Sequence, residues 1–305
     1  MATIKDIAAR AGVTATTVSR VINNRGYISE ETRKKVTQAM QEMNYQPNEL
    51  ARSLAKAHSN TIGVIVPHIS HPFFSKMISA LESAAAKRGY KILLCNSKDQ
   101  PEKETEYLDM FISNRVTGVV MASRDVQIEK FHDLKIPIVN FEREENTEAI
   151  TIQCDNEQGG ALAASHLADR RADGFLRVCR ERGIEGEVLL SDRLSYGSMH
   201  YESYIEKGLL EHPETDGIFA SSDLIAAQVL QRLYAMGKRV PEDIKVVGFD
   251  DTVIAGITTP SITTIHQPIE EMSELSIAYI DRRRKGEMVP NVTTMPVSLV
   301  VRDSA

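Results

Sequence analysis

Short hydroxyl side chains and one arginine lie close together near the N-terminus. Thr16, Thr17 and Ser19 have small side chains that allow the backbone to approach another surface closely. Arg20 can donate two parallel hydrogen bonds, the pattern that reads a guanine edge in the major groove of DNA. These residue types at this spacing therefore suit hydrogen bonding to base edges.

A second group of polar residues lies where apolar runs of strand length end. Carboxylates and an arginine at such positions could hold sugar hydroxyls by paired hydrogen bonds, although helix capping or a surface salt bridge explains any one of them equally well. The group comprises His71, Arg143, Asp155, Asp192, Asp223, Asp250 and Asp251. The rings of Phe73 and Phe74 either stack against a flat ligand or a sugar ring, or pack in a core.

Motifs for catalysis or cofactor binding do not stand out. The chain has no GxxxxGK[ST] or GxSxG sequence, and Gly159-Gly160 lacks the GxGxxG setting of a dinucleotide site. Cys95, Cys154 and Cys179 are far apart and have no CxxC spacing, which predicts reduced, apolar core residues. We therefore expect no cofactor, no metal and no enzymatic activity.

Two short helices and a turn must position the first group. Thr3 can cap a helix, with Asp6 completing the cap, and Ile4, Ile7 and Ala8 then share one face. Gly12 provides the turn.

Thr14 can cap the second helix, in which Val18, Val21 and Ile22 point inward and Ala15 to Arg20 otherwise lie largely outside. This arrangement is typical of a helix-turn-helix, although a hairpin from any helical bundle would share it. Ser29 can cap a third helix over residues 30–43, whose buried stripe would contain Val36, Ala39, Met40 and Met43.

Charge separates this N-terminal region from the rest. The 305-residue chain has a net charge of −6, yet residues 1–60 contain nine Lys or Arg against five Asp or Glu. The remainder has 27 basic and 37 acidic residues. A basic head on an acidic body suits a DNA-binding module joined to something that does not touch DNA.

The segment that follows the head is a candidate linker. Pro47 ends the third helix, and a fourth helix over residues 49–57 is too short to be stable alone. We expect it to fold only against DNA or a partner. Leu54 either packs against a dimer partner or inserts into the minor groove.

From Thr61 onward, strand-length apolar runs alternate with helical periods. The predicted strands are 61–67, 91–96, 117–123, 136–141 and 149–155, then 187–192, 216–223, 244–251, 261–268 and a region at 292–301. The predicted helices are 72–88, 101–114 and 126–133, then 199–211, 222–236 and 269–284. This alternation predicts an α/β fold with two doubly wound, parallel-sheet lobes and a small-molecule site between them at the strand carboxyl ends. No apolar run reaches the length of a membrane span, and the N-terminus has no apolar signal region.

At this point the chain resembles the lactose-repressor (LacI/GalR) family of bacterial transcription regulators. The resemblance rests on motifs along nearly all of its length: TIKDIAARAGVTATTVSRVIN, YQPNELARSLAKAHSNTIGVIVP, HPFFSKMISALE, CDNEQGG, FASSDLIAAQVLQ, VPEDIKVVGFDD and SITTIHQPI. The HPFF, CNS and FER segments are most similar to sugar-operon repressors of the ribose or sucrose type.

The resemblance implies a three-helix helix-turn-helix head over residues 1–46, a hinge helix over 47–60 and a periplasmic-binding-protein-like body over 61–305. Within the body it implies a first lobe of about 61–156 plus the C-terminal return, and a second lobe of about 157–290. It implies a homodimer on palindromic double-stranded operator DNA, in the bacterial cytoplasm and on the nucleoid when bound, with no membrane contact. The implied DNA-binding residues are Thr3, Ala15, Thr16, Thr17, Ser19, Arg20, Asn23, Tyr45, Asn48, Arg52, Ser53, Leu54 and Ala55. The implied contacts to a sugar or sugar phosphate are Phe73, Phe74, Arg143, Arg171, Asp223 and Gln267.

One stretch departs from the family pattern. Members have a strand of the GHRRIAFIGG kind before an RxxGF motif, whereas here HLADR runs directly into RADGF, so roughly 20 residues are absent. A helical stripe from Ala161 to Cys179 would then fuse two helices. The absent strand would be the first and central strand of the second lobe.

The combined reading is a sequence-specific repressor of a sugar-utilisation operon, controlled allosterically by a small sugar. The alternatives are a regulator that no effector controls, because of the missing segment, and a sugar-modifying α/β enzyme with a DNA-binding head. The last is disfavoured because no nucleophile, base and orienting group are found together at the predicted strand ends.

Overall fold

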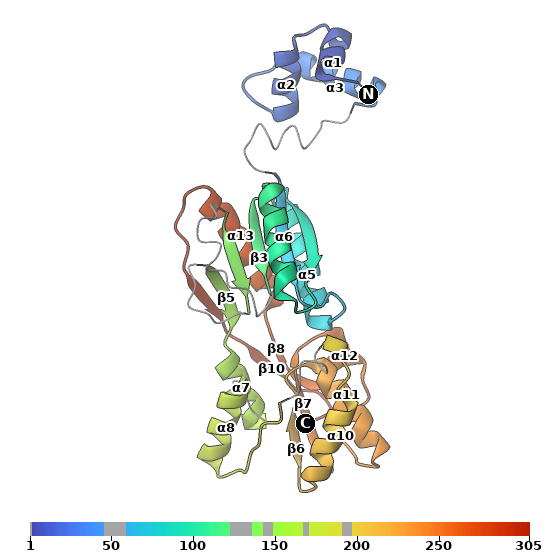
Figure 1. Ribbon diagram of the computed structural model, residues 1–305, viewed down its shortest axis with the longest axis vertical. Helices are drawn as coiled ribbons and strands as arrows, with labels where there is room; N and C mark the ends of the chain where they lie inside the picture. Colours follow the sequence, from blue (N-terminus) through green and yellow to red (C-terminus); the bar gives the residue numbers. More distant parts are fainter. Residues whose placement is uncertain (1, 46–58, 123–135, 143–148, 167–170, 191–196) are drawn as a thin grey trace. The chain divides into compact units, whose positions relative to one another are not determined.

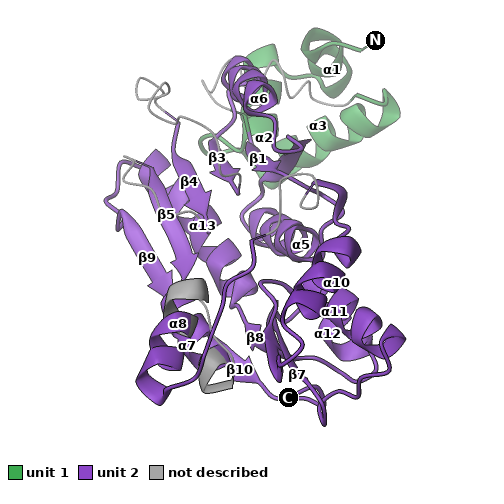
Figure 2. Cartoon of the chain, turned by 60° about the horizontal axis from the view of Figure 1, so that its bottom comes forward, with its two compact units in different colours: residues 1–59 green, residues 60–305 purple. Residues whose placement is uncertain are grey.

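The computed structural model describes residues 2–45, 59–122, 136–142, 149–166, 171–190 and 197–305, with side chains throughout these ranges except at 164–166 and 171–175. The chain divides into two compact units, residues 1–59 and 60–305 (Figure 2). The expected hinge helix at 49–57 and the expected helix at 126–133 lie outside the described residues.

The described part of the first unit contains the helices α1 (Ile4–Ala11), α2 (Ala15–Asn23) and α3 (Glu30–Glu42). Their N-caps are the predicted ones, since Thr3, Thr14 and Ser29 each accept a hydrogen bond from a backbone N–H in the first turn. The chain turns from α1 to α2 at Gly12, whose φ of 66° lies in the left-handed region that glycine adopts readily.

A small apolar core holds the three helices together. It contains Ile7, Ala8, Val18, Val21, Val36 and Ala39. Ile22, Met40 and Met43 pack partly buried against it, as predicted. Ile4, expected on the buried face, is the first residue of α1 and is 37 % exposed, whereas Ile7 and Ala8 are buried.

The second unit contains a six-stranded, entirely parallel sheet with the strand order β2-β1-β3-β4-β5-β9 (Figure 1). The strands are β1 (Thr61–Val66), β2 (Lys91–Asn96), β3 (Gly118–Met121), β4 (Ile138–Phe141), β5 (Ile150–Cys154) and β9 (Val292–Met295). Because the strands are parallel, all of them begin at one edge of the sheet and end at the opposite edge.

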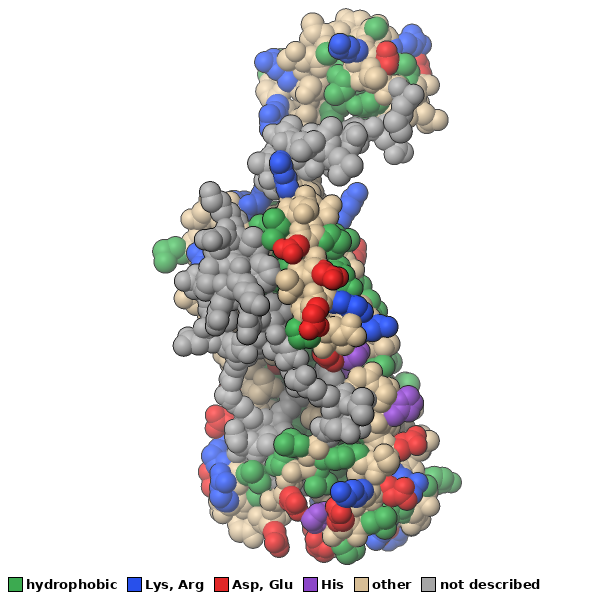
Figure 3. All heavy atoms as spheres, viewed as in Figure 1, with side chains coloured by type: hydrophobic (Ala, Val, Ile, Leu, Met, Phe, Trp, Pro, Cys, Tyr) green, Lys and Arg blue, Asp and Glu red, His purple; other side chains and the backbone are tan. Residues whose placement is uncertain are grey.

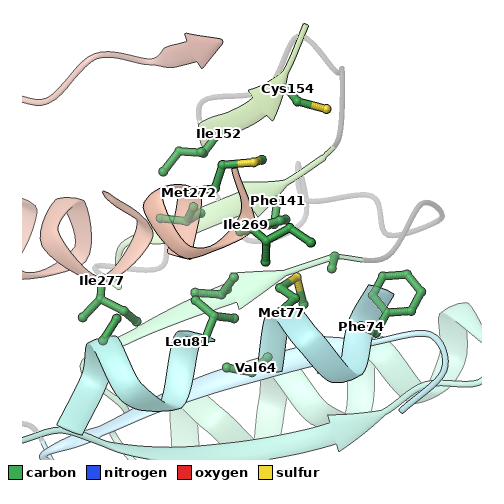
Figure 4. Close-up of a cluster of buried hydrophobic side chains, with 14 of the residues drawn as sticks. Val64, Phe74, Met77, Leu81, Phe141, Ile152, Cys154, Ile269, Met272 and Ile277 are labelled. Atoms are coloured by element: carbon green, nitrogen blue, oxygen red, sulfur yellow. The ribbon is translucent and has the colours of Figure 1, made fainter. Parts of the chain in front are cut away.

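Helices cover both faces of this sheet: α5 (Pro72–Lys87) and α13 (Ile269–Arg284) on one, and α6 (Pro101–Ser113) on the other. Alternate residues of β1 point to opposite faces. Val64 packs in the cluster with α5 and α13, whereas Ile65 packs in the cluster with α6. Figure 4 shows side chains of α5, among them Met77 and Leu81, and of α13, among them Met272 and Ile277, in one buried cluster.

Among the described residues, the second sheet has four strands in the order β10-β8-β7-β6. They are β6 (Gly217–Phe219), β7 (Lys245–Asp250), β8 (Thr263–His266) and β10 (Ser298–Val300), of which only β10 is antiparallel to its neighbour. The accompanying helices are α7 (Asn156–His166), α8 (Arg171–Arg182), α10 (Glu202–Glu211), α11 (Asp223–Ala235) and α12 (Val253–Ile257). The fold is thus the predicted α/β class with a helix-turn-helix head and two doubly wound lobes.

The second lobe differs from the sequence prediction at three places. Residues 187–190 form no strand, so the strand expected at 187–192 is wrong over its described part. The single fused helix is also wrong, because α7 and α8 are separate and pack against each other. The region 292–301 forms two strands, β9 in the first sheet and β10 in the second.

The missing segment explains the first difference. A strand needs a neighbour for its backbone N–H and C=O groups, and β6 forms the edge of the sheet where a further strand would pair. In the absence of that neighbour, residues 187–190 form no strand, and Leu190 is 82 % exposed.

Candidate nucleic-acid interface and effector site

The exposed side of α2 carries the residues predicted to read DNA. Thr16 and Arg20 are exposed on it, one helical turn apart. Among the described residues, none forms an ion pair or side-chain hydrogen bond with Arg20. Its guanidinium is therefore available for a base or a phosphate.

Other residues predicted to contact DNA form hydrogen bonds or packing contacts within the head. Thr17 Oγ1 lies 2.9 Å from Thr14 Oγ1, and Asn23 donates from Nδ2 to the carbonyl of Ser19 at 2.8 Å. Ala15 and Tyr45 are half-buried against the core of the head. These side chains therefore contact the head itself, and Thr16 and Arg20 remain as exposed residues of α2.

The cap of α1 fixes the approach of the N-terminus. The Thr3 backbone N–H and hydroxyl both donate to Asp6 Oδ2 at 2.8 Å. These hydrogen bonds stabilise the carboxylate and lower the pKa of Asp6.

The remaining predicted DNA contacts, namely Asn48, Arg52, Ser53, Leu54 and Ala55, lie outside the described residues.

The carboxyl ends of strands from both sheets meet at Gln267, which follows β8. Gln267 is fully buried and donates from Nε2 to Asp250 Oδ1 at 2.6 Å, at the end of β7. Its amide oxygen lies 3.1 Å from Cys154 Sγ, at the end of β5 in the other sheet. A neutral amide therefore joins the polar ends of the two lobes.

Asp250 was noted from the sequence only as one of many polar residues at strand ends. Its φ of 107° is an uncommon backbone conformation for a residue other than glycine, and such conformations are concentrated at functional sites. Its position at a strand end is the signal in the sequence, whereas its φ and its contact with Gln267 distinguish it in the structure.

Asp251, the next residue, forms a charged cluster. Its carboxylate accepts from Arg302 Nη2 at 2.7 Å and lies 2.9 Å from His266 Nδ1. Burial acts to raise its pKa, but the hydrogen bonds from Arg302 and His266 outweigh burial, so the pKa of Asp251 is lowered. Its backbone carbonyl also accepts from Lys76 Nζ of α5 at 3.3 Å, a second link between the lobes.

Asp223 lies at the start of α11 with no exposed surface. Thr252 donates to its Oδ2 from the backbone N–H at 2.6 Å and from the hydroxyl at 2.9 Å, and Thr264 donates to its Oδ1 at 2.5 Å. Burial raises the pKa of Asp223 to about 6, despite these hydrogen bonds. In this structure both carboxylate oxygens hold α11 to the loop after β7 and to β8.

Phe73 and Phe74 pack in the core of the first lobe. They are 7 % and 8 % exposed, and their ring centroids lie 5.2 Å apart in an edge-to-face arrangement. Phe73 also contacts the ring of Phe141. The structure thus brings Gln267 to the junction of the lobes and places Asp223, Phe73 and Phe74 in packed surroundings. Arg143 and the side chain of Arg171 lie outside the described residues.

No metal-binding cluster of His, Cys, Asp and Glu occurs in the part of the chain that the structure describes. Within the same part, no helix is both long and apolar enough to cross a membrane.

Family models match both units. Residues 3–48 match bacterial regulatory proteins of the lacI family, residues 62–196 match a periplasmic binding protein domain, and residues 159–305 match a periplasmic binding protein-like domain.

Relatives of known function align over essentially the whole chain. A ribose operon repressor from Halalkalibacterium halodurans is 35 % identical, with 100 % of this chain and 97 % of that protein aligned. A sucrose operon repressor from Pediococcus pentosaceus is 35 % identical, with 97 % of each aligned. The first alignment spans 327 positions although this chain has 305 residues, which agrees with a missing segment of about 20 residues.

Solved structures share the fold. A LacI transcriptional regulator from Alkaliphilus metalliredigens in complex with D-xylulofuranose is 33 % identical, with a TM-score of 0.71 over 81 % of this chain and 99 % of that one. The lac repressor dimer bound to operator has a TM-score of 0.86 over 99 % of this chain and 98 % of that one, at 24 % identity. The chain is therefore a DNA-binding transcriptional regulator rather than an enzyme, and it belongs to the lacI family of bacterial regulatory proteins.

Proposed function

We propose that this regulator represses a sugar-utilisation operon and that a small sugar bound between its two lobes controls its affinity for the operator. The observation that carries the proposal is the contact of Gln267 with Asp250 on one side and Cys154 on the other. The ribose and sucrose operon repressors that align with the full chain support the class of effector.

The chemistry at the junction suits a polyhydroxylated ligand. A carboxylate accepts hydrogen bonds from sugar hydroxyls, and an amide both donates and accepts. A sugar that engaged Asp250 and Gln267 would replace their mutual hydrogen bond, and would therefore prefer one arrangement of the lobes over another. We assign these two residues to the effector site, and we retain Phe73, Phe74, Arg143, Arg171 and Asp223 as further candidates.

The control follows from differential binding. A ligand can shift an equilibrium between lobe arrangements only by the difference in its affinity for them. The first lobe joins the DNA-binding head through residues 46–60, so a change in that lobe can alter how two heads of a homodimer meet a palindromic operator. We place the protein in the bacterial cytoplasm, on the nucleoid when it is bound to the operator.

The decisive experiment is fluorescence anisotropy with a labelled palindromic operator at one fixed salt concentration, with and without each sugar. Salt must be fixed because phosphate contacts make the affinity steeply salt-dependent. We would test ribose, sucrose, xylulose and cellobiose, together with their phosphates. A change of operator affinity of about 5-fold or more with one sugar would support the proposal.

A second candidate function is repression that no effector controls. The observations that favour it are the four strands described in the second sheet and the lack of a strand at residues 187–190. In that case, operator binding would be tight and none of the sugars would change it or produce heat in calorimetry. A clear binding isotherm for any sugar would exclude it.

A further inference from the structure

A basic surface lies at the end of the second unit where its chain begins. Seven exposed cations occur there, at the end of α5, the start of β2 and the end of α13. They are Lys87, Arg88, Lys91, Arg282, Arg283, Arg284 and Lys285. We call this set the basic rim; Figure 3 shows Lys and Arg side chains near this end of the unit.

Backbone pairing places the rim beside the entry of the chain from the DNA-binding head. The Lys91 backbone N–H donates to the carbonyl of Asn60 at 2.9 Å, and Lys91 pairs in register with Thr61. The hydroxyl of Tyr90 donates to Asp281 Oδ1 at 2.7 Å, which brings the last turn of α13 to the same edge. Figure 1 shows α13 ending at the end of the sheet where β1 begins.

Local electrostatics accounts for only part of this charge. Cations near helix C-termini offset the helix dipole, and Asp281 pairs with Arg284 and Lys285. Likewise Glu274 pairs with Lys87 and Arg88, and Glu287 pairs with Arg282.

Three carboxylates thus face seven cations, on a body whose overall charge is negative. In the described part of the chain, Lys91 and Arg283 have no carboxylate within ion-pair distance. Lys91 also lies at the start of a strand, where there is no helix dipole to offset.

We propose that the basic rim contacts DNA phosphates, so that the effector unit adds to the DNA interface formed by the head. Excess positive charge at the end that continues into a DNA-binding head matches the charge of the duplex that the head engages. Such contacts would add affinity without reading sequence, because a phosphate is the same at every base pair.

The test is the salt dependence of DNA binding by the full chain without sugar. The DNA would be the palindromic duplex that the wild-type protein selects from a random pool, alongside an unrelated duplex of equal length. The variant is Lys91→Ala/Arg283→Ala. The matched control, Arg182→Ala/Lys238→Ala, removes one arginine and one lysine that are exposed on the second lobe. Circular dichroism confirms that each variant is folded.

We expect the rim variant to lower the slope of log affinity against log salt by about 2 to 4 per dimer, on both duplexes. If the two proteins converge at ~1 M salt, binding at ~0.1 M salt should be weaker by roughly 100-fold or more. The control should keep the wild-type slope. A wild-type slope for the rim variant would overturn the proposal. An acidic protein surface would then be the alternative partner of the basic rim. An equal decrease for the control would overturn it too, because net charge rather than contact would then be responsible. Neither result depends on whether a sugar controls the protein.

Discussion

At the scale of single residues, Asp223 illustrates how burial changes the pKa of a carboxylate. Three donors from Thr252 and Thr264 surround it, yet burial holds its pKa at about 6 rather than near 3.8. The folded protein therefore retains this proton at a pH where the unfolded chain has lost it.

The consequence is a pH-dependent stability with a defined sign. Below pH 4 the group is protonated in both states, and between about pH 4 and 6 the folded state binds more protons, so its contribution falls as pH rises. We predict that Asp223→Asn gains about 2 to 3 kcal/mol relative to the wild type between pH 4.5 and 7.5, measured by urea unfolding. Parallel pH profiles for the two proteins would contradict this assignment.

Gln267 supports a prediction about sugar binding. Replacing it by alanine removes the donor to Asp250 and the acceptor for Cys154. We expect Gln267→Ala to weaken sugar binding by about tenfold or more in calorimetry and to cost about 1 to 2 kcal/mol of stability. The control is Gln153→Ala, a glutamine of β5 whose amide bonds Thr294 in β9. Equal sugar affinity in the two variants would remove Gln267 from the site.

At the scale of elements, different residues of α2 and its cap are responsible for the stability of the helix and for DNA recognition. The hydroxyl of Thr14 caps the helix at Thr17, whereas Arg20 has no partner among the described residues. We predict that Arg20→Ala weakens operator binding by about 1 to 3 kcal/mol with unchanged thermal stability, as anisotropy and calorimetry would measure. Thr14→Ala should instead lower the stability of the head by about 1 kcal/mol. An unfolded Arg20→Ala head would show that the arginine is structural.

Features that depend on neighbouring residues were predicted from the sequence more accurately than features that depend on distant ones. The caps at Thr3, Thr14 and Ser29 depend on residues three apart, so local spacing was sufficient to predict them. The division of 292–301 into two strands depends on partners elsewhere in the chain, because β9 pairs with β5 and β10 pairs with β8. Local periodicity contains no information about either partner.

The candidate site was predictable to a similar extent. The family resemblance identified Gln267, but the surroundings of Asp223 depend on Thr252 and Thr264, which are 29 and 41 residues away. The same limit applies to 187–190, whose apolar sequence is typical of a strand but whose neighbouring strand is missing. A sequence pattern shows that a segment can pair, whereas the structure shows whether a partner exists.

At the scale of the whole molecule, the two units should respond separately to their ligands. Each has its own core, and they divide near residue 59. We predict two transitions in differential scanning calorimetry. A sugar at about 100 times its Kd should raise only the transition of residues 60–305, by about 5 to 10 °C. Operator DNA should raise the transition of the head, and one common transition shifted equally by both ligands would show that the units unfold together.

The parallel first sheet has a consequence for how such regulators diverge. Its strands begin beside the entry from the head, and β5 ends at Cys154 beside Gln267, so the junction with the head and the proposed effector site lie at opposite edges of one sheet. Substitutions near the strand ends can change which sugar is bound, while the operator sequence that the head reads stays the same. One fold can in this way give rise to regulators that respond to different sugars, without any change in the residues that bind the operator.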